Sequence, residues 1–203
     1  ILMDIRRTVR LLALALTGLG ASAAHAAADG SQLALPPGAT VAIVVFEDLQ
    51  CPDCARAHPG LLAASEASKV PLVIHDFPIT RHVWAFPAAV LARYFTAQSP
   101  ELGSEFRSFI FENQKDITPD NLRQFGERFA AQHKLQLPPD IDPDGKLQAL
   151  VQADFDLGKQ IHLEYVPLMF VLGPGLGAAN FVEVMDPAEI ADVVARARKA
   201  TSP

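Results

Sequence analysis

The chain's two cysteines, Cys51 and Cys54, lie two residues apart between an apolar run and a segment with helical signals. Residues 41–46 are continuously apolar and rich in β-branched side chains, which predicts a buried strand. Pro52 suits the first turn of a helix over residues 51–68, and Pro59 should kink that helix. The sequence therefore predicts that both sulfurs lie where a buried strand leads into a helix.

The rest of the chain alternates between strand and helix signals. Strands are expected over residues 70–77, 165–172 and 181–184, and a final helix runs from Asp186 to about Lys199. Residues 84–161 look helical throughout, with segments that begin at Trp84, Ser99, Thr118 and Pro143. This block is too long to be a loop, so we expect an α/β fold with one small mixed sheet and a helical subdomain.

The N-terminal residues have the features of a secretory signal. Arginines precede an apolar run over residues 11–21, and Ala24-His25-Ala26 provides a small-x-small cleavage site. The run is shorter than the roughly 20 residues that span a bilayer; a retained membrane anchor is the alternative. Cleavage after Ala26 removes three arginines and one aspartate, changes the net charge from −6 to −8, and leaves residues 27–39 as a flexible lead-in.

Export and charge narrow the possible functions. An acidic chain is a poor candidate for binding nucleic acid. Exported proteins occupy compartments where disulfides form and persist, so the cysteine pair is expected to be oxidised at least part of the time.

Several roles for the cysteine pair can be compared. Ala55 stands where c-type haem attachment needs histidine. A zinc or copper site using Cys51, Cys54 and His58 lacks a fourth ligand nearby. A structural disulfide across so short a loop would add little stability. Thiol–disulfide exchange fits better, with Cys51 as the nucleophile activated by the helix N-terminus and Cys54 as the resolving thiol.

Phe46-Glu47-Asp48 followed by Cys51-Pro52-Asp53-Cys54 resembles the DsbA-like branch of the thioredoxin superfamily, which often has the pattern F-x-D-x-x-C-P-x-C. Pro59 and the pair Val166-Pro167 are similar to that superfamily's helix proline and cis-proline loop. The resemblance covers residues 38–200. It implies a thioredoxin-like fold over residues 40–83 and 162–203, with residues 84–161 as the inserted helical subdomain.

The resemblance also implies roles for individual residues. Pro52, Asp53, Val166 and Pro167 are expected to modulate the active site, and the backbone of Val166 would pair with an extended substrate segment. Trp84 and Phe86 are candidates for a substrate groove, with core packing as the alternative.

Three polar residues near the cysteines have simpler interpretations. We interpret His58 as a residue on the helix surface. Glu47 and Asp48 are interpreted as local turn formers.

Two positions depart from the family pattern. Val45 stands where thioredoxin-like proteins commonly carry a buried acid. The part that this acid plays in proton transfer would here fall to water, to Glu47, to Asp48 or to no group. Asp53 stands where strongly oxidising relatives carry histidine. Its carboxylate should destabilise the Cys51 thiolate, which predicts a reduction potential below that of the strongest periplasmic oxidants.

The sequence thus predicts a periplasmic or otherwise exported thiol–disulfide oxidoreductase that works as a dithiol oxidase, without a cofactor or metal. Its substrates would be unfolded or cysteine-containing exported proteins, and a DsbB-like or VKOR-like membrane protein would re-oxidise it. A reductase or isomerase kept reduced by a membrane electron donor is the alternative, followed by a metal-delivery protein and a non-catalytic binding module. The short N-terminal segment favours a monomer.

Overall fold

The computed structural model describes residues 28–201, so the expected signal peptide lies outside the described residues. Strands and helices follow one another as in the predicted order. The elements are β1 (Ala42–Glu47), α1 (Pro52–Ser68), β2 (Leu72–Asp76), α2 (Ala85–Gln98), α3 (Pro100–Glu112), α4 (Leu122–Gln132), α5 (Lys146–Gln160), β3 (Leu168–Leu172), β4 (Phe181–Val184) and α6 (Ile190–Thr201), with short 3-10 turns η1 (Gly30–Gln32), η2 (Gln114–Asp116) and η3 (Pro187–Glu189).

The described residues form a four-stranded mixed sheet in the order β2-β1-β3-β4. β1 runs parallel to β2, with Val45 opposite Ile74, and antiparallel to β3, with Val45 opposite Met169. β4 completes the sheet antiparallel to β3. All residues of β1 are buried, as expected for a central strand covered on both faces.

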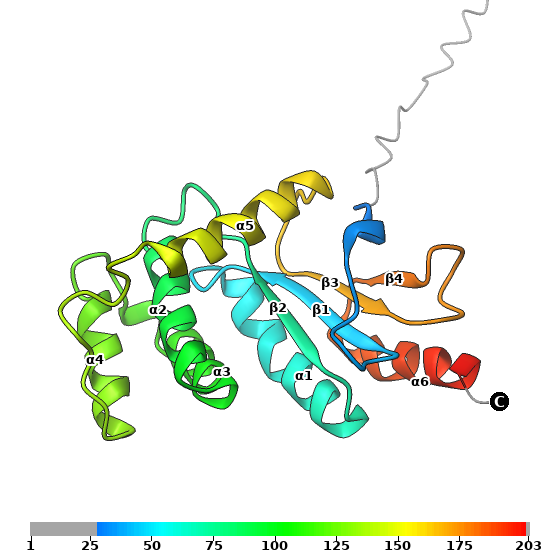
Figure 1. Ribbon diagram of the computed structural model, residues 1–203, viewed down its shortest axis with the longest axis horizontal. Coiled ribbons are helices and arrows are strands. Elements are labelled where there is room, and N and C mark those ends of the chain that lie inside the picture. Colours follow the sequence, from blue (N-terminus) through cyan, green and yellow to red (C-terminus); the bar gives the residue numbers. More distant parts are fainter. Residues whose placement is uncertain (1–27, 202–203) are drawn as a thin grey trace, which may run out of the picture.

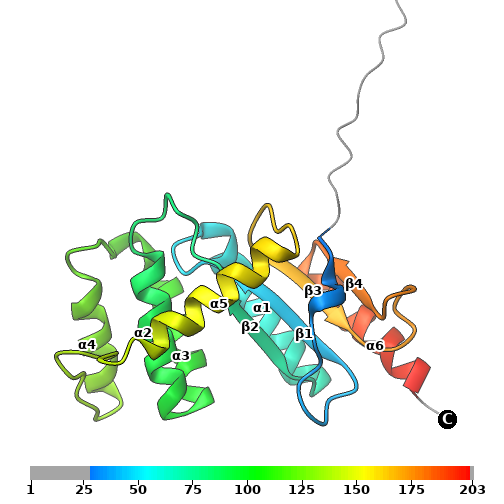
Figure 2. The ribbon, with the colours of Figure 1, turned by 45° about the horizontal axis from the view of Figure 1, so that its top comes forward.

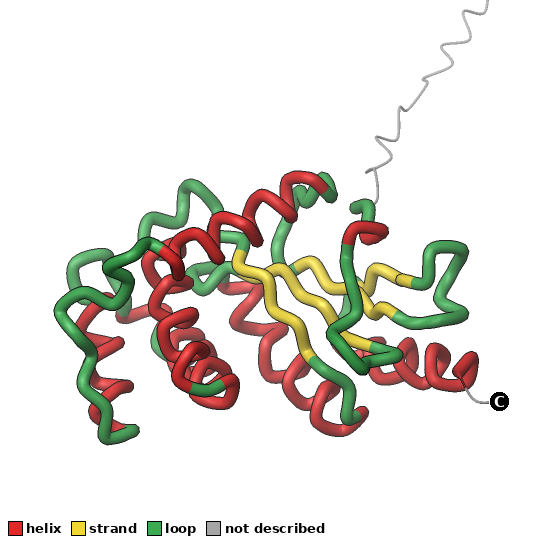
Figure 3. The backbone as a smooth tube through the Cα atoms, in the orientation of Figure 1, coloured by secondary structure: helices red, strands yellow, loops and turns green. Residues whose placement is uncertain are grey.

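Helices cover both faces of the sheet (Figures 1 and 3). On one face, α1 and α6 pack against side chains of β1 and β3; this cluster includes Val45, Met169, Leu61 and Val194. On the other side, α5 contacts both α2 and β2 and runs from the helical block across to the sheet (Figure 2). This arrangement confirms the thioredoxin-like α/β fold with a helical insertion.

The second face of the sheet and the helical insertion share one hydrophobic core. Phe46 and Phe170 from the sheet belong to the same buried cluster as Phe95, Phe106 and Phe129 from α2, α3 and α4. Both cysteines also belong to this cluster. The insertion is therefore packed directly against the strand end that carries the cysteine pair.

The helical block contains a non-helical stretch, which corrects the expectation that residues 84–161 are helical throughout. Residues 133–145 connect α4 to α5 without helix, and prolines at three positions of this stretch disfavour one. Asp142 then accepts hydrogen bonds from the backbone N–H groups of Leu147 and Gln148 at the start of α5, both at 2.9 Å. β3 begins at Leu168 rather than at Tyr165, because Pro167 has no N–H to donate to the ladder.

A buried network of charges joins the sheet to the helical insertion. Arg107 of α3 donates to Glu47 at the end of β1, at 3.0 Å, and to Asp76 at the end of β2, at 2.7 Å. All three residues are at most 3% exposed. Arg93 of α2 pairs with Asp76 at 2.6 Å and with Asp154 of α5. These pairs fix three helices of the insertion to the carboxyl ends of the two parallel strands.

Replacing Arg107 by methionine should destabilise the protein by about 3–5 kcal/mol, because Glu47 and Asp76 would remain buried without their cation. Urea unfolding under reducing conditions measures this change. Arg56→Met is the matched control, since its pair with Asp53 is exposed and such pairs contribute about 1 kcal/mol or less. Equal losses in the two variants would contradict the prediction.

Candidate functional site

Cys51 and Cys54 lie at the junction between β1 and α1, as predicted. Cys51 is the residue that precedes the first helical position, Pro52, and Cys54 follows within the first turn. Both are free thiols and both are largely buried, Cys51 at 7% and Cys54 at 1% exposed. The more accessible sulfur therefore belongs to the cysteine at the helix N-terminus, where the unpaired N–H groups favour a thiolate.

The peptide bond between Val166 and Pro167 is cis and lies beside the cysteines. The Cys51 thiol is 3.8 Å from the carbonyl oxygen of Val166. This loop immediately precedes β3, the strand that pairs with β1. The sheet thus brings together two segments of the predicted site that are far apart in the sequence.

The two thiols have opposite protonation properties. The hydrogen bond from Cys54 is the largest influence on Cys51 and lowers the pKa of Cys51 from 9.0 to about 6, although its own burial opposes this. Burial raises the pKa of Cys54 far above its ordinary value, and the neighbouring Cys51 raises it further. At neutral pH the reduced pair therefore holds a thiolate at Cys51 and a proton at Cys54.

The turn that carries Cys51 is anchored on both sides by side-chain amides. Gln114 of η2 donates to the carbonyl oxygens of Leu49, at 2.7 Å, and Cys51, at 3.1 Å. Gln50 accepts a hydrogen bond from the backbone N–H of Trp84 at 2.9 Å. Sequence reasoning missed both glutamines, because isolated glutamines show no pattern that signals such contacts.

Asp48 forms a turn as expected, but it also makes longer-range contacts. Its carboxylate accepts from the backbone N–H of Gln50 at 2.6 Å, from that of Ile79 at 2.7 Å, and from Nδ1 of His82 at 2.8 Å. The backbone N–H of Asp48 is 3.4 Å from the Cys54 sulfur. Burial raises the pKa of this carboxyl, although its hydrogen bonds act in the opposite direction.

The interpretations of Glu47 and His58 are corrected by their burial. Glu47 is the last residue of β1 rather than a turn former, and His58 is 1% exposed rather than on the helix surface. His58 Nδ1 lies 3.5 Å from Glu47 Oε2, and His58 Nε2 lies 3.1 Å from the Ser108 hydroxyl. Burial acts to raise the pKa of Glu47, but the neighbouring His58 and the charge of Arg107 outweigh it and lower that pKa.

A cavity of about 400 Å³ opens beside Cys51. Val166 and Tyr165 line it from the cis-proline loop, Asp53 from α1, and Phe155 from α5. Asp53 itself is exposed and pairs with Arg56 one helical turn later. The two residues proposed for a substrate groove lie elsewhere: Trp84 is buried in the core at 3% exposure, and Phe86 lines a different cavity.

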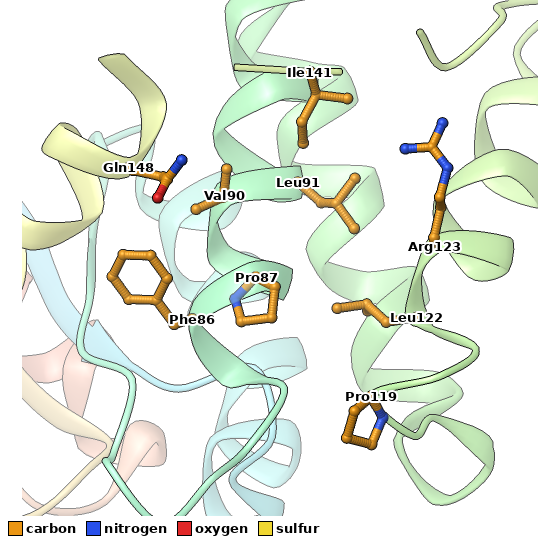
Figure 4. Close-up of a pocket in the computed structure, with 9 residues that line it drawn as sticks. All are labelled: Phe86, Pro87, Val90, Leu91, Pro119, Leu122, Arg123, Ile141 and Gln148. Carbon is orange, nitrogen blue, oxygen red and sulfur yellow. The ribbon is translucent and has the colours of Figure 1, made fainter. Parts of the chain in front are cut away.

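This second cavity, of about 410 Å³, lies among α2, α4, α5 and the connection before α5 (Figure 4). Its lining is mostly apolar, with Phe86, Val90 and Leu122 among the residues drawn. Arg123 at its edge donates to the backbone carbonyls of residues 138 and 139. That guanidinium is therefore engaged in holding the connection to α4.

Two further properties concern only the described residues. Within residues 28–201, no group of three or more histidine, cysteine or acidic side chains is arranged to hold a metal ion. Over the same residues, no helix combines the length and the apolar character needed to cross a membrane.

Comparisons with known proteins agree with this geometry. Residues 36–185 match the protein family Thioredoxin_4, described as Thioredoxin. No curated protein sequence compared with the chain matches it.

Solved structures show the same fold at low sequence identity. The chain is similar to alpha-DsbA1 of Wolbachia pipientis, with a TM-score of 0.64 and 16% identity over 84% of this chain and 97% of that one. It is also similar to reduced DsbA1 of Neisseria meningitidis, with a TM-score of 0.60 and 16% identity over 83% of this chain and 88% of that one. A linker-deletion variant of Proteus mirabilis ScsC matches with a TM-score of 0.60 and 13% identity over 79% of this chain and 72% of that one. With its strand-to-helix cysteine pair facing a cis-proline loop, the chain belongs to the thioredoxin family and has the DsbA-like form of its fold.

Proposed function

We propose that the protein is an exported thiol–disulfide oxidoreductase that acts as a dithiol oxidase through Cys51 and Cys54. The observation that carries this proposal is the Cys51 sulfur, which lies at a helix N-terminus, has a lowered pKa and faces the carbonyl of Val166 at 3.8 Å. A thiolate at this position is both a good nucleophile and a good leaving group in disulfide exchange.

Oxidation of a substrate begins when a substrate thiolate attacks the Cys51 sulfur of the disulfide. The bond between Cys51 and Cys54 breaks, a mixed disulfide forms at Cys51, and Cys54 leaves and takes up a proton, as its raised pKa favours. A second substrate thiolate then attacks the substrate sulfur of the mixed disulfide, and Cys51 leaves as a thiolate. Two electrons thus pass from the substrate dithiol to the cysteine pair, and one disulfide replaces another.

The cavity beside Cys51 suits an unfolded or cysteine-containing protein chain. An extended substrate segment would lie along the cis-proline loop and pair with the backbone of Val166. Phe155, Leu163 and Tyr165 give the cavity apolar surface for substrate side chains. Such contacts tolerate many sequences, as an enzyme that acts on diverse exported proteins requires.

Export and re-oxidation complete the proposal. The basic stretch, the apolar run and the Ala-His-Ala site at the N-terminus support cleavage of a signal peptide and action in the periplasm or another exported location. A DsbB-like or VKOR-like membrane protein would accept the two electrons from the reduced pair. The mature protein would act as a monomer without a bound cofactor.

Replacing Cys51 by serine should abolish oxidation of a reduced test protein, because the buried Cys54 alone cannot form the disulfide that the substrate attacks. Cys54→Ser cannot form the disulfide either and should also lose oxidase activity, but its Cys51 thiolate should attack disulfide-bonded proteins and stay trapped as a mixed disulfide, because Cys54 is not there to displace the bound partner. Non-reducing gels and refolding of a reduced, disulfide-dependent protein measure both effects. A Cys51→Ser variant with undiminished oxidase activity would exclude the proposed function.

The direction of electron flow can be tested by trapping thiols in the cells that produce the protein. A dithiol oxidase should be recovered mostly as the Cys51–Cys54 disulfide, because its membrane partner keeps it oxidised. Recovery of the pair mostly as free thiols would favour the reductase or isomerase instead.

The reactivity of Cys51 should depend on pH with a midpoint near 6, its lowered pKa. Alkylation rates and thiolate absorbance of the reduced protein would report this titration. In the reduced protein, the pKa of Cys51 is lower in the folded chain than in the unfolded chain, so ionisation of this thiol stabilises the folded state. The stabilisation is fully present at a pH above the unfolded pKa of 9.0, and it is lost as the pH falls to the folded pKa of about 6. A reactivity midpoint near 9 would contradict the assignment of Cys51 as the activated nucleophile.

Replacing Asp53 by histidine should lower the pKa of Cys51 and make the disulfide more oxidising, because a carboxylate near the thiolate is removed. The effect should stay below about tenfold in the exchange equilibrium, or one pKa unit, since Asp53 is exposed and paired with Arg56. Asp53→Asn separates loss of the negative charge from gain of the imidazole. Titration against glutathione measures the equilibrium, and unchanged values in both variants would exclude a role for Asp53.

A further inference from the structure

The side chain of Gln114 connects the helical insertion directly to the turn that carries Cys51. Gln114 lies in η2, the short turn that follows α3. Its amide nitrogen donates to the carbonyl oxygen of Leu49 at 2.7 Å and to that of Cys51 at 3.1 Å. Because carbonyl oxygens only accept, the amide nitrogen is the part of this side chain that can bind both of them, and both of its hydrogens are used.

Gln114 extends from a rigid base. The backbone N–H of Asn113 donates to the carbonyls of Phe109 and Ile110 in the last turn of α3, both at 3.2 Å. The side chain of Asn113 also donates to Phe109, at 2.7 Å. The backbone N–H of Asp116 then donates to the carbonyl of Asn113 at 3.0 Å and closes the turn around Gln114. The amide is therefore attached to backbone that is itself hydrogen-bonded on both sides.

α3 also contacts the chain before Cys51 at a second point. Arg107 of this helix binds the carboxylate of Glu47, the last residue of β1, at 3.0 Å. Gln114 binds the chain two and four residues later, at Leu49 and Cys51. The segment from residue 47 to residue 51 is therefore held near both of its ends from α3 and the turn that follows it.

The same segment determines how the two cysteines lie relative to each other. The backbone N–H of Cys51 donates to the carbonyl of Asp48 at 3.0 Å, and the backbone N–H of Asp48 is 3.4 Å from the Cys54 sulfur. The Cys51 carbonyl accepts from the backbone N–H of Ala55 at 3.1 Å as well as from Gln114. Among these contacts, the one from Gln114 comes from a different element of the fold.

We propose that Gln114 is a positioning residue of the redox reaction: its amide holds the backbone of Cys51 where Cys54 can reach the Cys51 sulfur, and so favours closure of the disulfide. This inference rests on the proposed oxidoreductase function. Gln114 acts through the backbone of the turn and takes no part in bond making. The helical insertion thereby influences the redox equilibrium through one side chain.

The step that depends on Gln114 is the closure of the disulfide from a mixed disulfide. When oxidised glutathione meets the reduced pair, the Cys51 thiolate attacks one glutathione sulfur, and the other glutathione leaves as a thiolate. Cys54 then loses its proton to solvent and attacks the Cys51 sulfur, and the second glutathione leaves. Two electrons have passed from the cysteine pair to glutathione. This second step becomes faster and more favourable as the effective concentration of Cys54 at the Cys51 sulfur rises.

Loss of the amide should affect the oxidised turn more than the reduced turn. The disulfide ring would keep the carbonyls of Leu49 and Cys51 where Gln114 bound them, now without that donor. In the reduced protein no ring constrains the turn, so these carbonyls can rotate toward other donors. Because an unpaired buried polar group is costly and Leu49 is 2% exposed, the equilibrium should shift toward the dithiol.

Gln114→Met tests the inference, because methionine has a similar length and no donor. We expect the glutathione equilibrium to shift by about threefold to tenfold toward the dithiol, as for one lost hydrogen bond, and the mixed disulfide at Cys51 to live longer. Acid quenching followed by mass spectrometry measures both. Gln114→Asn, whose amide lies one methylene further from the turn, should give a smaller shift in the same direction and provides the test if the methionine variant folds poorly.

Gln124→Met is the matched control, since Gln124 is an exposed glutamine of α4 in the same insertion. A role of Gln114 in folding alone would destabilise both redox forms equally and leave the equilibrium unchanged. An unchanged equilibrium in Gln114→Met, a shift toward the disulfide, or an equal shift in Gln124→Met would overturn the inference, while oxidase activity of the wild type left the proposed function intact. Failure of the wild type to exchange disulfides with glutathione would instead overturn the proposed function, and the inference with it.

Discussion

The buried cation of Arg107 is the constraint on which the rest of the architecture depends. It lies between Glu47 and Asp76, the last residues of the two parallel strands, and it belongs to a helix of the insertion. Charges this deeply buried tolerate little displacement, because each would lose its partner in a medium that solvates it poorly. The turn that carries the cysteines begins directly after Glu47, so the position of the sulfurs relative to the helices is set by the same ion pairs.

The parts of the fold that follow from local patterns could be predicted from the sequence. The apolar run before Cys51 and the proline after it predict the strand and the helix, and helical spacing of apolar residues predicts most of the insertion. Glu47 and Arg107 are 60 residues apart in the chain, and no local pattern in the sequence indicates that they pair. For the same reason Glu47 looked like a turn former and His58 like a surface residue, although the fold buries both.

The site combines features that were predicted with features that were missed. The cysteines and the cis-proline loop were expected together, and they lie together. The contacts that hold the turn, from Gln114, Gln50 and His82, come from side chains without a motif. The position of Cys51 therefore depends on groups that the fold brings to the turn as well as on the dipeptide between the cysteines. Two chains with the same motif can differ in redox behaviour for this reason.

The core shared by the sheet and the insertion has a consequence for how such a fold can vary. Phe46 and Phe170 project from the sheet into a cluster completed by phenylalanines of α2, α3 and α4. A shorter relative without these helices would expose that aromatic face to water, so it would need polar side chains at the corresponding strand positions. Length and strand composition must therefore change together, and the helical insertion cannot be exchanged as an independent module.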